Sequence, residues 1–321
     1  LFRSVLHHLI VHGSGLVHIS DLPKSFATYQ KLFFESLFLF PVCCYVFISG
    51  YFGIKVTFNK LLSLWFQCLF YSVTIIVVLA ILNIYPFAIK SLLRSFFPIL
   101  SNQWWFVTCY FLLVIFSPVL NFLTENITKT MFHYLLIVVF LVNTVFCFNK
   151  NYGFWAFLDP SIVNFVFIYI LGRYFSLNKI QFKMSRLKIL YVYLALCFFL
   201  FCITFALLNF GHAKYIMHIY QLNNPLILIE SICIFYVFSG LKPDYSIIDK
   251  LGGMMFSVYL IHDHKLVRNY IYTNIFQIND FSSSLLYIFY LLFFAMTIMT
   301  LCLPVEYIRR MVFSPVVKII C

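Results

Sequence analysis

Long apolar stretches alternate with short polar segments along the whole chain. Within a stretch the apolar residues occupy odd and even positions alike, as in the run from Phe111 to Ile115. A membrane β-strand would instead alternate apolar and polar residues at every second position, whereas a membrane-spanning helix needs about 20 mostly apolar residues in a row. The pattern therefore predicts helices that cross a lipid bilayer. We expect about ten of them, at 1–17, 32–52, 61–85, 104–123, 131–148, 154–176, 188–210, 224–240, 253–274 and 283–304.

These segments fill the chain and leave no room for a soluble domain. The connections between them are short and carry turn residues such as Asn223-Asn224-Pro225 and Gly252-Gly253. No internal repeat is apparent in the sequence. We therefore expect an all-α, polytopic transmembrane bundle that forms one membrane-embedded domain over residues 1–321. The first segment, 1–17, is shorter than a full span.

Composition agrees with a membrane protein. Of the 321 residues, 63% are hydrophobic and only 10% are charged, against about 25% charged residues in soluble globular domains. The formal charge of +12 is spread over the connections, which fits anionic lipid headgroups and gives no reason to expect a nucleic-acid partner. The Lys and Arg bias of these connections favours a cytoplasmic N-terminus, with the basic stretch 173–188 on the same side.

The first segment contains three histidines, His7, His8 and His12. His8 and His12 share one helix face, and His7 lies about a quarter-turn away. Ionisable groups inside a membrane are costly, at least about 2.5–3.5 kcal/mol for a charged one near the centre, so each is a functional candidate. Two interpretations stay open: a general base, because imidazole titrates near neutral pH, or a neutral histidine bonded to a neighbouring helix. The pair His8 and His12 has the spacing to hold a metal ion, but no further ligand accompanies it, so we expect no metal site.

A second group of polar residues lies in segment 253–274. Its apolar run from Met254 to Ile261 is too short to span a bilayer, so a full crossing carries charged residues into the membrane. In helical projection Tyr259, His262 and Asp263 lie close together, while His264 faces away from them. The alternative is an ordinary ion-paired helix end.

Four further residues stand out against their surroundings. Glu230 has only apolar neighbours in sequence, so it must find a partner or be protonated. Trp104, Trp105 and Tyr110 fit an aromatic belt at the membrane interface.

Five short motifs occur in a fixed order along the chain. They are Leu6-His7-His8 with His12-Gly13; the run Phe47 to Phe52; Trp105-Phe106 with Tyr110 and the run Ser117 to Asn121; Asn224-Pro225-Leu226; and the run Val258 to Asp263. Together they resemble the acyltransferase-3 family, integral-membrane enzymes that O-acylate surface polysaccharides and related glycans. The resemblance covers essentially the whole chain.

The resemblance implies roles for the residues singled out above. His8 matches the family's first-helix histidine and would be the catalytic base, with His7 as a weaker candidate beside it. Lys55 and Lys60 lie in the loop where the family has basic residues, and would contact the donor. The remaining candidates would contact the acceptor or support the base: Tyr259, His262, Asp263, Trp105, Tyr110 and Glu230. The family's signature Arg would fall before Leu1, so we expect the first helix to be truncated at its N-terminus.

The expected activity follows from the same resemblance. It is transfer of an acetyl group from acyl-coenzyme A to a hydroxyl of a cell-surface polysaccharide or lipid-linked glycan, at the bacterial inner membrane. Acyl-coenzyme A is a substrate here, and no cofactor is expected. Two alternatives remain, a flippase for a lipid-linked glycan and a glycan polymerase. Transporters commonly show inverted repeats, which this sequence lacks, and the longest external connection, 86–103, carries only two charges.

Overall fold

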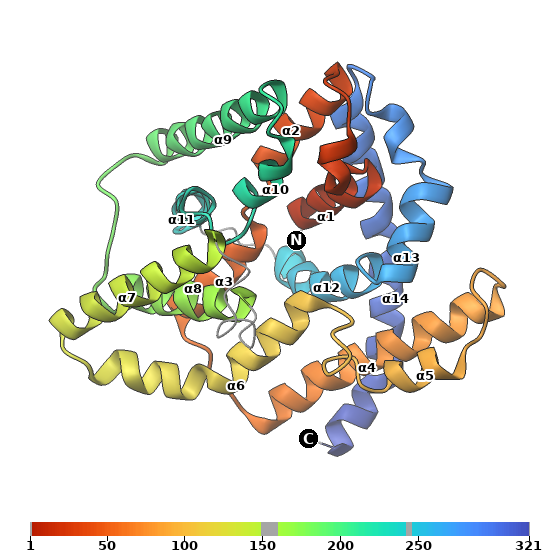
Figure 1. The fold of residues 1–321 in the computed structure, drawn as a ribbon. Coiled ribbons are helices and arrows are strands. Elements are labelled where there is room, and N and C mark those ends of the chain that lie inside the picture. The colour runs from red at the N-terminus through yellow and green to blue at the C-terminus, as the bar shows by residue number, and fades with distance from the viewer. Residues whose placement is uncertain (1, 149–159, 242–245, 321) are drawn as a thin grey trace. The chain divides into compact units, whose positions relative to one another are not determined.

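The computed structural model describes residues 2–148, 160–241 and 246–320 of the chain. These residues form 14 α-helices and no strand, with 79% of the residues helical, which confirms the all-α prediction (Figure 1). The chain divides into two compact units. Unit 1 comprises residues 1–14, 57–111 and 243–321, and unit 2 comprises residues 15–56 and 112–242.

Unit 1 is built around the helix α12 and the two longer helices α4 and α14. The helix α12 packs against α14, α4 and the short α1, and α5 packs against α4. A hydrophobic core fills the space between them, with Leu9, Leu260 and Leu291 fully buried. The helices of unit 1 are α1 (Phe2–His8), α4 (Phe58–Ile81), α5 (Ile89–Ser95), α12 (Ser246–His262), α13 (Lys265–Asn269) and α14 (Tyr287–Ile320).

Unit 2 centres on the pair α3 and α8, which also contact α11 and α7, respectively. A Cβ atom at Gly50 would fall on the carbonyl oxygen of Tyr169, and one at Gly172 would fall on that of Phe47. The two helices therefore approach as closely as glycine permits. The helices of unit 2 are α2 (Phe26–Phe38), α3 (Pro41–Phe52), α7 (Lys129–Phe148), α8 (Pro160–Leu177), α9 (Arg186–Asn209), α10 (Ile216–Ile219) and α11 (Pro225–Phe238). The boundary between the units falls within α6 (Trp105–Asn126).

Over the described residues the predicted segments correspond to helices, and positions 154–159 of segment 154–176 lie outside those residues. Three of the segments are interrupted. Segment 32–52 divides between α2 and α3. Segment 1–17 leaves α1 at His8 and continues as a π-helix, Leu9–Gly13. Segment 253–274 ends α12 at His262, restarts as α13 and finishes as a second π-helix, Tyr270–Ile275. Short π-helical turns often occur at functional sites, and both of these lie in unit 1.

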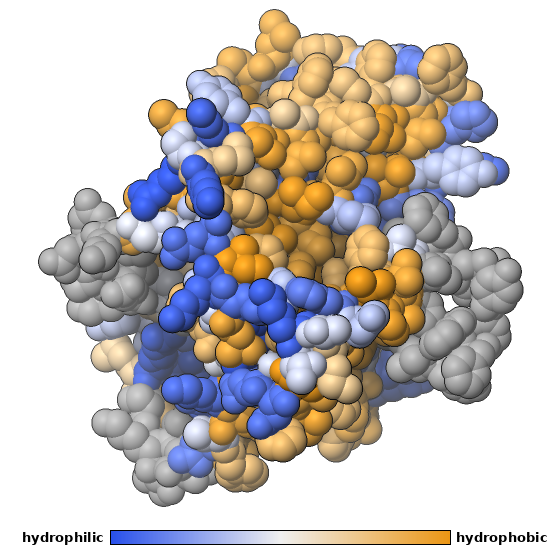
Figure 2. Space-filling model, turned by 90° about the vertical axis from the view of Figure 1, so that its left-hand side faces the viewer, coloured by the Kyte–Doolittle hydropathy of each residue, from blue (hydrophilic) through white to orange (hydrophobic). Residues whose placement is uncertain are grey.

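Five helical stretches in the described residues are long and apolar enough to cross a membrane. Much of their apolar surface is exposed, for example Phe198 on α9 and Phe293 on α14. Lipid rather than water suits such surfaces, and the chain is a multi-pass membrane protein. Figure 2 views the side on which α7 and α9 lie, where hydrophilic side chains gather in one band and hydrophobic ones cover much of the remaining described surface. The five stretches are Phe26–Phe52, Phe58–Ile81, Trp105–Asn126, Arg186–Asn209 and Tyr287–Phe313.

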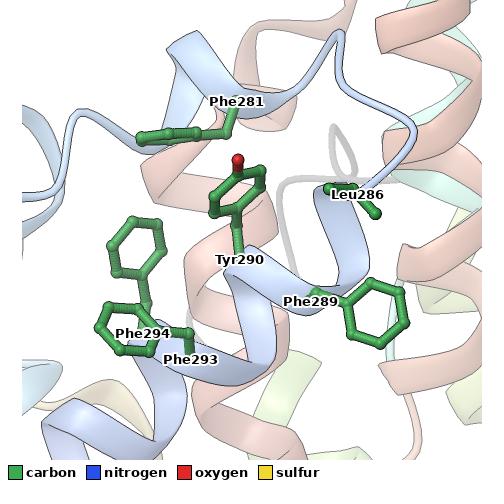
Figure 3. A pocket seen from close by; sticks show the side chains of 6 residues that line it. All are labelled: Phe281, Leu286, Phe289, Tyr290, Phe293 and Phe294. Carbon is green, nitrogen blue, oxygen red and sulfur yellow. The ribbon is translucent and has the colours of Figure 1, made fainter.

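An open pocket of about 440 Å³ lies at the N-terminal end of α14. In Figure 3 the ring of Tyr290 stands between Phe281 on one side and the rings of Phe293 and Phe294 on the other. The Phe281 and Tyr290 ring centres are 4.4 Å apart. The lining of this pocket is almost wholly apolar, and it holds none of the candidate functional residues.

Candidate functional site

His8 is the centre of a buried polar group in unit 1. It is the last residue of α1, and its side chain is buried at 7% exposure for the residue. Its Nδ1 lies 3.1 Å from His262 Nε2 and 3.5 Å from Asp263 Oδ1. Both partners are buried and stand where α12 ends. The proximity of His262 and Asp263 expected from the helical projection is thus found in the structure, with His8 against both.

The hydrogen-bond network assigns the protons on the two histidines. His262 Nδ1–H donates to the carbonyl oxygen of Val258, 2.5 Å away. In neutral His262 the other nitrogen, Nε2, is then an acceptor, and it receives the Nδ1–H of His8. The lone pair of His8 is therefore on Nε2, the ring atom that faces neither partner. A neutral histidine held in this tautomer is ready to accept a proton.

Asp263 is held by a second contact. Arg268 Nη1 donates to Asp263 Oδ1 at 2.9 Å, and this arginine lies on α13. The pairing is possible because the helix breaks between His262 and Lys265, which brings α13 back towards the end of α12. A guanidinium beside a buried carboxyl favours its charged form. We refer to His8, His262, Asp263 and Arg268 as the His8 group.

Aromatic rings border the His8 group. The rings of His7 and His12 lie 5.3 and 5.9 Å from that of His8, and the ring of Tyr259 lies 6.1 Å away. Phe106 packs edge-on against Tyr259, and Tyr110 stacks on Phe106. Phe106 thus links the ring of Tyr110 to that of Tyr259.

The chain after His8 is fixed by close packing within unit 1. A Cβ atom at Gly13 would lie 2.6 Å from Ile278 Cδ1, so only a glycine permits this approach without a shift of the isoleucine. The hydroxyls of Ser14 and Tyr287 are hydrogen-bonded. These contacts anchor the π-helix that follows His8, and so hold the imidazole in place.

A second polar group begins at the residue that follows Asp263. His264 Nε2 lies 2.5 Å from Gln103 Nε2. Ser72 donates to Gln103 Oε1. Trp104 packs edge-on against His264, with ring centres 5.6 Å apart. We refer to His264, Gln103, Ser72 and Trp104 as the His264 group.

Sequence reasoning missed two members of the His264 group. Ser72 and Gln103 are uncharged and occur in or beside apolar runs, so nothing in the sequence marks them. The sequence placed Trp104 beside Trp105 in one aromatic belt, yet Trp104 is 1% exposed and Trp105 is 37% exposed. Adjacent residues at a helix start cannot both face inward, and only packing decides between them.

The remaining candidates lie apart from these groups. Lys60 is exposed in the first turn of α4, in unit 1. Lys55 is exposed just after α3, and Glu230 is fully buried on α11, both in unit 2. Within the described residues neither carboxyl oxygen of Glu230 has a hydrogen-bond partner.

Comparison with known protein families gives a match over nearly the whole chain. A family model described as an acyltransferase domain matches residues 4–306, nearly the whole chain, and this match includes both polar groups. No curated protein and no solved structure gives a significant match. Over the described ranges, no set of three or more His, Cys, Asp or Glu residues is arranged to hold a metal ion.

Proposed function

The chain belongs to the acyltransferase-3 family, and on that premise we propose that it transfers an acetyl group from acyl-coenzyme A to a hydroxyl of a cell-surface polysaccharide or lipid-linked glycan. The observation that carries the proposal is the buried contact of His8 with His262 and Asp263. This contact leaves His8 Nε2 as a proton acceptor inside a membrane protein of an acyltransferase family.

Acyl transfer needs a base at one step and an acid at the next. The acceptor hydroxyl oxygen attacks the thioester carbonyl carbon while its proton passes to His8 Nε2. The carbon–sulfur bond then breaks, and the thiolate of coenzyme A takes the proton back from His8. The histidine therefore ends the cycle in the form in which it began.

Asp263 stabilises the intermediate stage of this cycle. When His8 is protonated, its positive charge lies 3.5 Å from the Asp263 carboxylate, which attracts it in a buried setting. Arg268 keeps the carboxylate oriented without itself touching His8. His262 fixes the tautomer of His8, and all three are thus positioning residues in the proposal.

The substrates are assigned by chemistry. Acyl-coenzyme A is strongly anionic, and the exposed Lys55 and Lys60 are the residues that we assign to its phosphates. Tyr259 borders His8 and is assigned to the acceptor, together with Trp105, Tyr110 and Glu230 as weaker candidates. The location proposed is the bacterial inner membrane, and the reaction as proposed uses no metal or bound cofactor.

The test is mass spectrometry of surface glycans from a bacterial strain that lacks this protein. We expect the full chain to restore an acetyl mass to the glycan, His8→Ala to fail, and His18→Ala, an exposed histidine, to restore it as well as the wild type does. Full acetylation with His8→Ala would exclude His8 as the base. An unchanged acetyl pattern together with glycan retained inside the cell would exclude the transferase and favour the flippase.

A further inference from the structure

Two ring nitrogens in the His264 group are buried without a hydrogen-bond partner in the described structure. They are Trp104 Nε1 and His264 Nδ1, on residues that are 1% and 2% exposed. Buried polar atoms are almost always paired, because each one left unpaired destabilises the fold. Two such atoms on rings that touch one another indicate a site whose occupant supplies the missing partner.

The hydrogen bonds around His264 determine what the occupant must be. Ser72 donates to Gln103 Oε1, which turns the Gln103 amide N–H₂ towards His264 Nε2. Because this nitrogen accepts, the ring proton of neutral His264 is on Nδ1. Trp104 Nε1–H is a donor in every state. Both unpaired atoms are therefore N–H donors, and they suit an oxygen that only accepts, as a carbonyl oxygen does.

The position of this pair relates it to the proposed base. Asp263 belongs to the His8 group and His264, the next residue, to the His264 group. Their Cα atoms are about 3.8 Å apart, as in any trans peptide. The two polar groups therefore share one short segment of backbone, which carries Asp263 at the first group and His264 at the second.

We infer that the N–H groups of Trp104 and His264 bind a carbonyl oxygen of a substrate, with Gln103 and Ser72 fixing the tautomer of His264. This inference rests on the proposed function, because the acyl thioester is the carbonyl that such a reaction brings to His8. Its oxygen gains negative charge when the hydroxyl attacks and returns to a carbonyl when the carbon–sulfur bond breaks. Two N–H donors in a buried site stabilise that charge without any transfer of protons.

The test uses the purified full chain in lipid nanodiscs and membranes that contain the natural glycan. Acetyl-coenzyme A and free coenzyme A serve as paired binding probes, because they differ by the acetyl group alone. Trp104→Phe removes one donor and keeps a ring, and Trp65→Phe, on α4 in the same unit, is its matched control. His264→Leu removes the second donor, whereas His264→Asn retains an N–H near the position of Nδ1.

We expect Trp104→Phe and His264→Leu to lower the rate of acetyl transfer about 10²-fold or more, as loss of an oxyanion donor does elsewhere, and His264→Asn to recover part of it. A loss of affinity for acetyl-coenzyme A alone assigns the site to the acetyl carbonyl. An equal loss for both probes assigns it to an amide carbonyl of coenzyme A, and a raised KM for the glycan alone assigns it to a carbonyl of the acceptor.

Two results overturn the inference, and they differ from failure of the proposed function. If Trp104→Phe and His264→Leu match Trp65→Phe in transfer and in both affinities, the nitrogens are satisfied by water and no substrate carbonyl binds there. If the variants lose thermal stability and activity in proportion, and His264→Asn recovers neither, the role is structural. If the wild type itself neither binds acetyl-coenzyme A nor transfers acetate, the proposed function is wrong and this site falls with it.

Discussion

His8 Nδ1 and His262 Nε2 lie 3.1 Å apart, and this contact decides which nitrogen of neutral His8 carries the proton. His262 has committed its own proton to the carbonyl of Val258, so it can only accept from His8. The pair therefore holds neutral His8 in one tautomer, and neither histidine has to be charged for this. A single main-chain carbonyl, one helical turn before His262, sets the protonation pattern of the whole His8 group.

Asp263→Asn tests the charge that faces His8. An amide keeps the shape of the carboxyl but cannot stabilise a protonated imidazole, so we expect kcat to fall about 10²-fold or more while KM for acetyl-coenzyme A stays nearly constant. Initial rates of acetate transfer in membranes measure this. Asp280→Asn, at an exposed aspartate in the same unit, is the control. Equal rates for the two variants would remove Asp263 from the mechanism.

Tyr169→Phe tests the segment that precedes Lys55. The Tyr169 hydroxyl accepts from Ile54 N–H at 2.9 Å and donates to Asn121 Oδ1 at 2.7 Å, and Asn121 Nδ2 donates to the Ile54 carbonyl at 3.0 Å. This closed set of bonds holds the backbone next to Lys55. We expect its loss to raise KM for acetyl-coenzyme A about fivefold, which is the effect of about one hydrogen bond.

In this experiment kcat is expected to stay within twofold of the wild type, on the order of the error in such rates. Tyr191→Phe on α9, with an exposed ring, is the matched control. A fall in kcat with KM unchanged would show that the segment serves the chemical step and does not serve donor binding.

Glu306→Gln tests a buried ion group at the C-terminal part of α14. The Glu306 carboxylate is fully buried and accepts hydrogen bonds from Tyr71, Arg309 and Arg310, each at 2.7 Å. Removal of a buried charge that two arginines share leaves them uncompensated, so we expect the free energy of unfolding to fall by about 3 kcal/mol. Denaturant titration in detergent micelles measures the change.

Glu125→Gln gives the comparison for this loss. Glu125 pairs with Arg173 at 2.5 Å, but its side chain is 51% exposed. Water already solvates much of that carboxylate, so the expected loss is about 1 kcal/mol or less. Similar losses for the two variants would mean that burial of Glu306 adds nothing to the strength of its ion pairs.

Gly50→Ala tests the close approach of α3 and α8. The added methyl group would meet the carbonyl of Tyr169, which is main chain and cannot move aside alone. We expect a loss of about 2 kcal/mol in the free energy of unfolding, typical of overpacking. At Gly252, where no atom lies within 4 Å of the added Cβ, the same change should stabilise by up to about 1 kcal/mol through helix propensity. Equal effects at the two positions would contradict this packing.

The sequence was sufficient to predict where most helices lie, because long apolar runs in lipid have few alternatives to helix. It also led to His8, Tyr259, His262 and Asp263, because polar residues inside apolar runs are conspicuous. The interruptions after His8 and His262 were not predictable, since no proline occurs there and the π-helical turns depend on partners such as Ile278. Likewise, the pairing of Gln103 with His264 joins residues 161 positions apart. Only the folded chain reveals such contacts.

The break in the helix at 263–264 places consecutive side chains in two different polar groups, Asp263 beside His8 and His264 beside Trp104. A substitution that displaces this short segment moves both groups together. Under the two proposals above, a variant selected to accept a larger acyl group at His264 would also have a displaced Asp263 beside His8. A variant selected for faster proton transfer at His8 would also have an altered preference among acyl groups. In this fold the breadth of substrates and the speed of reaction are expected to evolve as one trait.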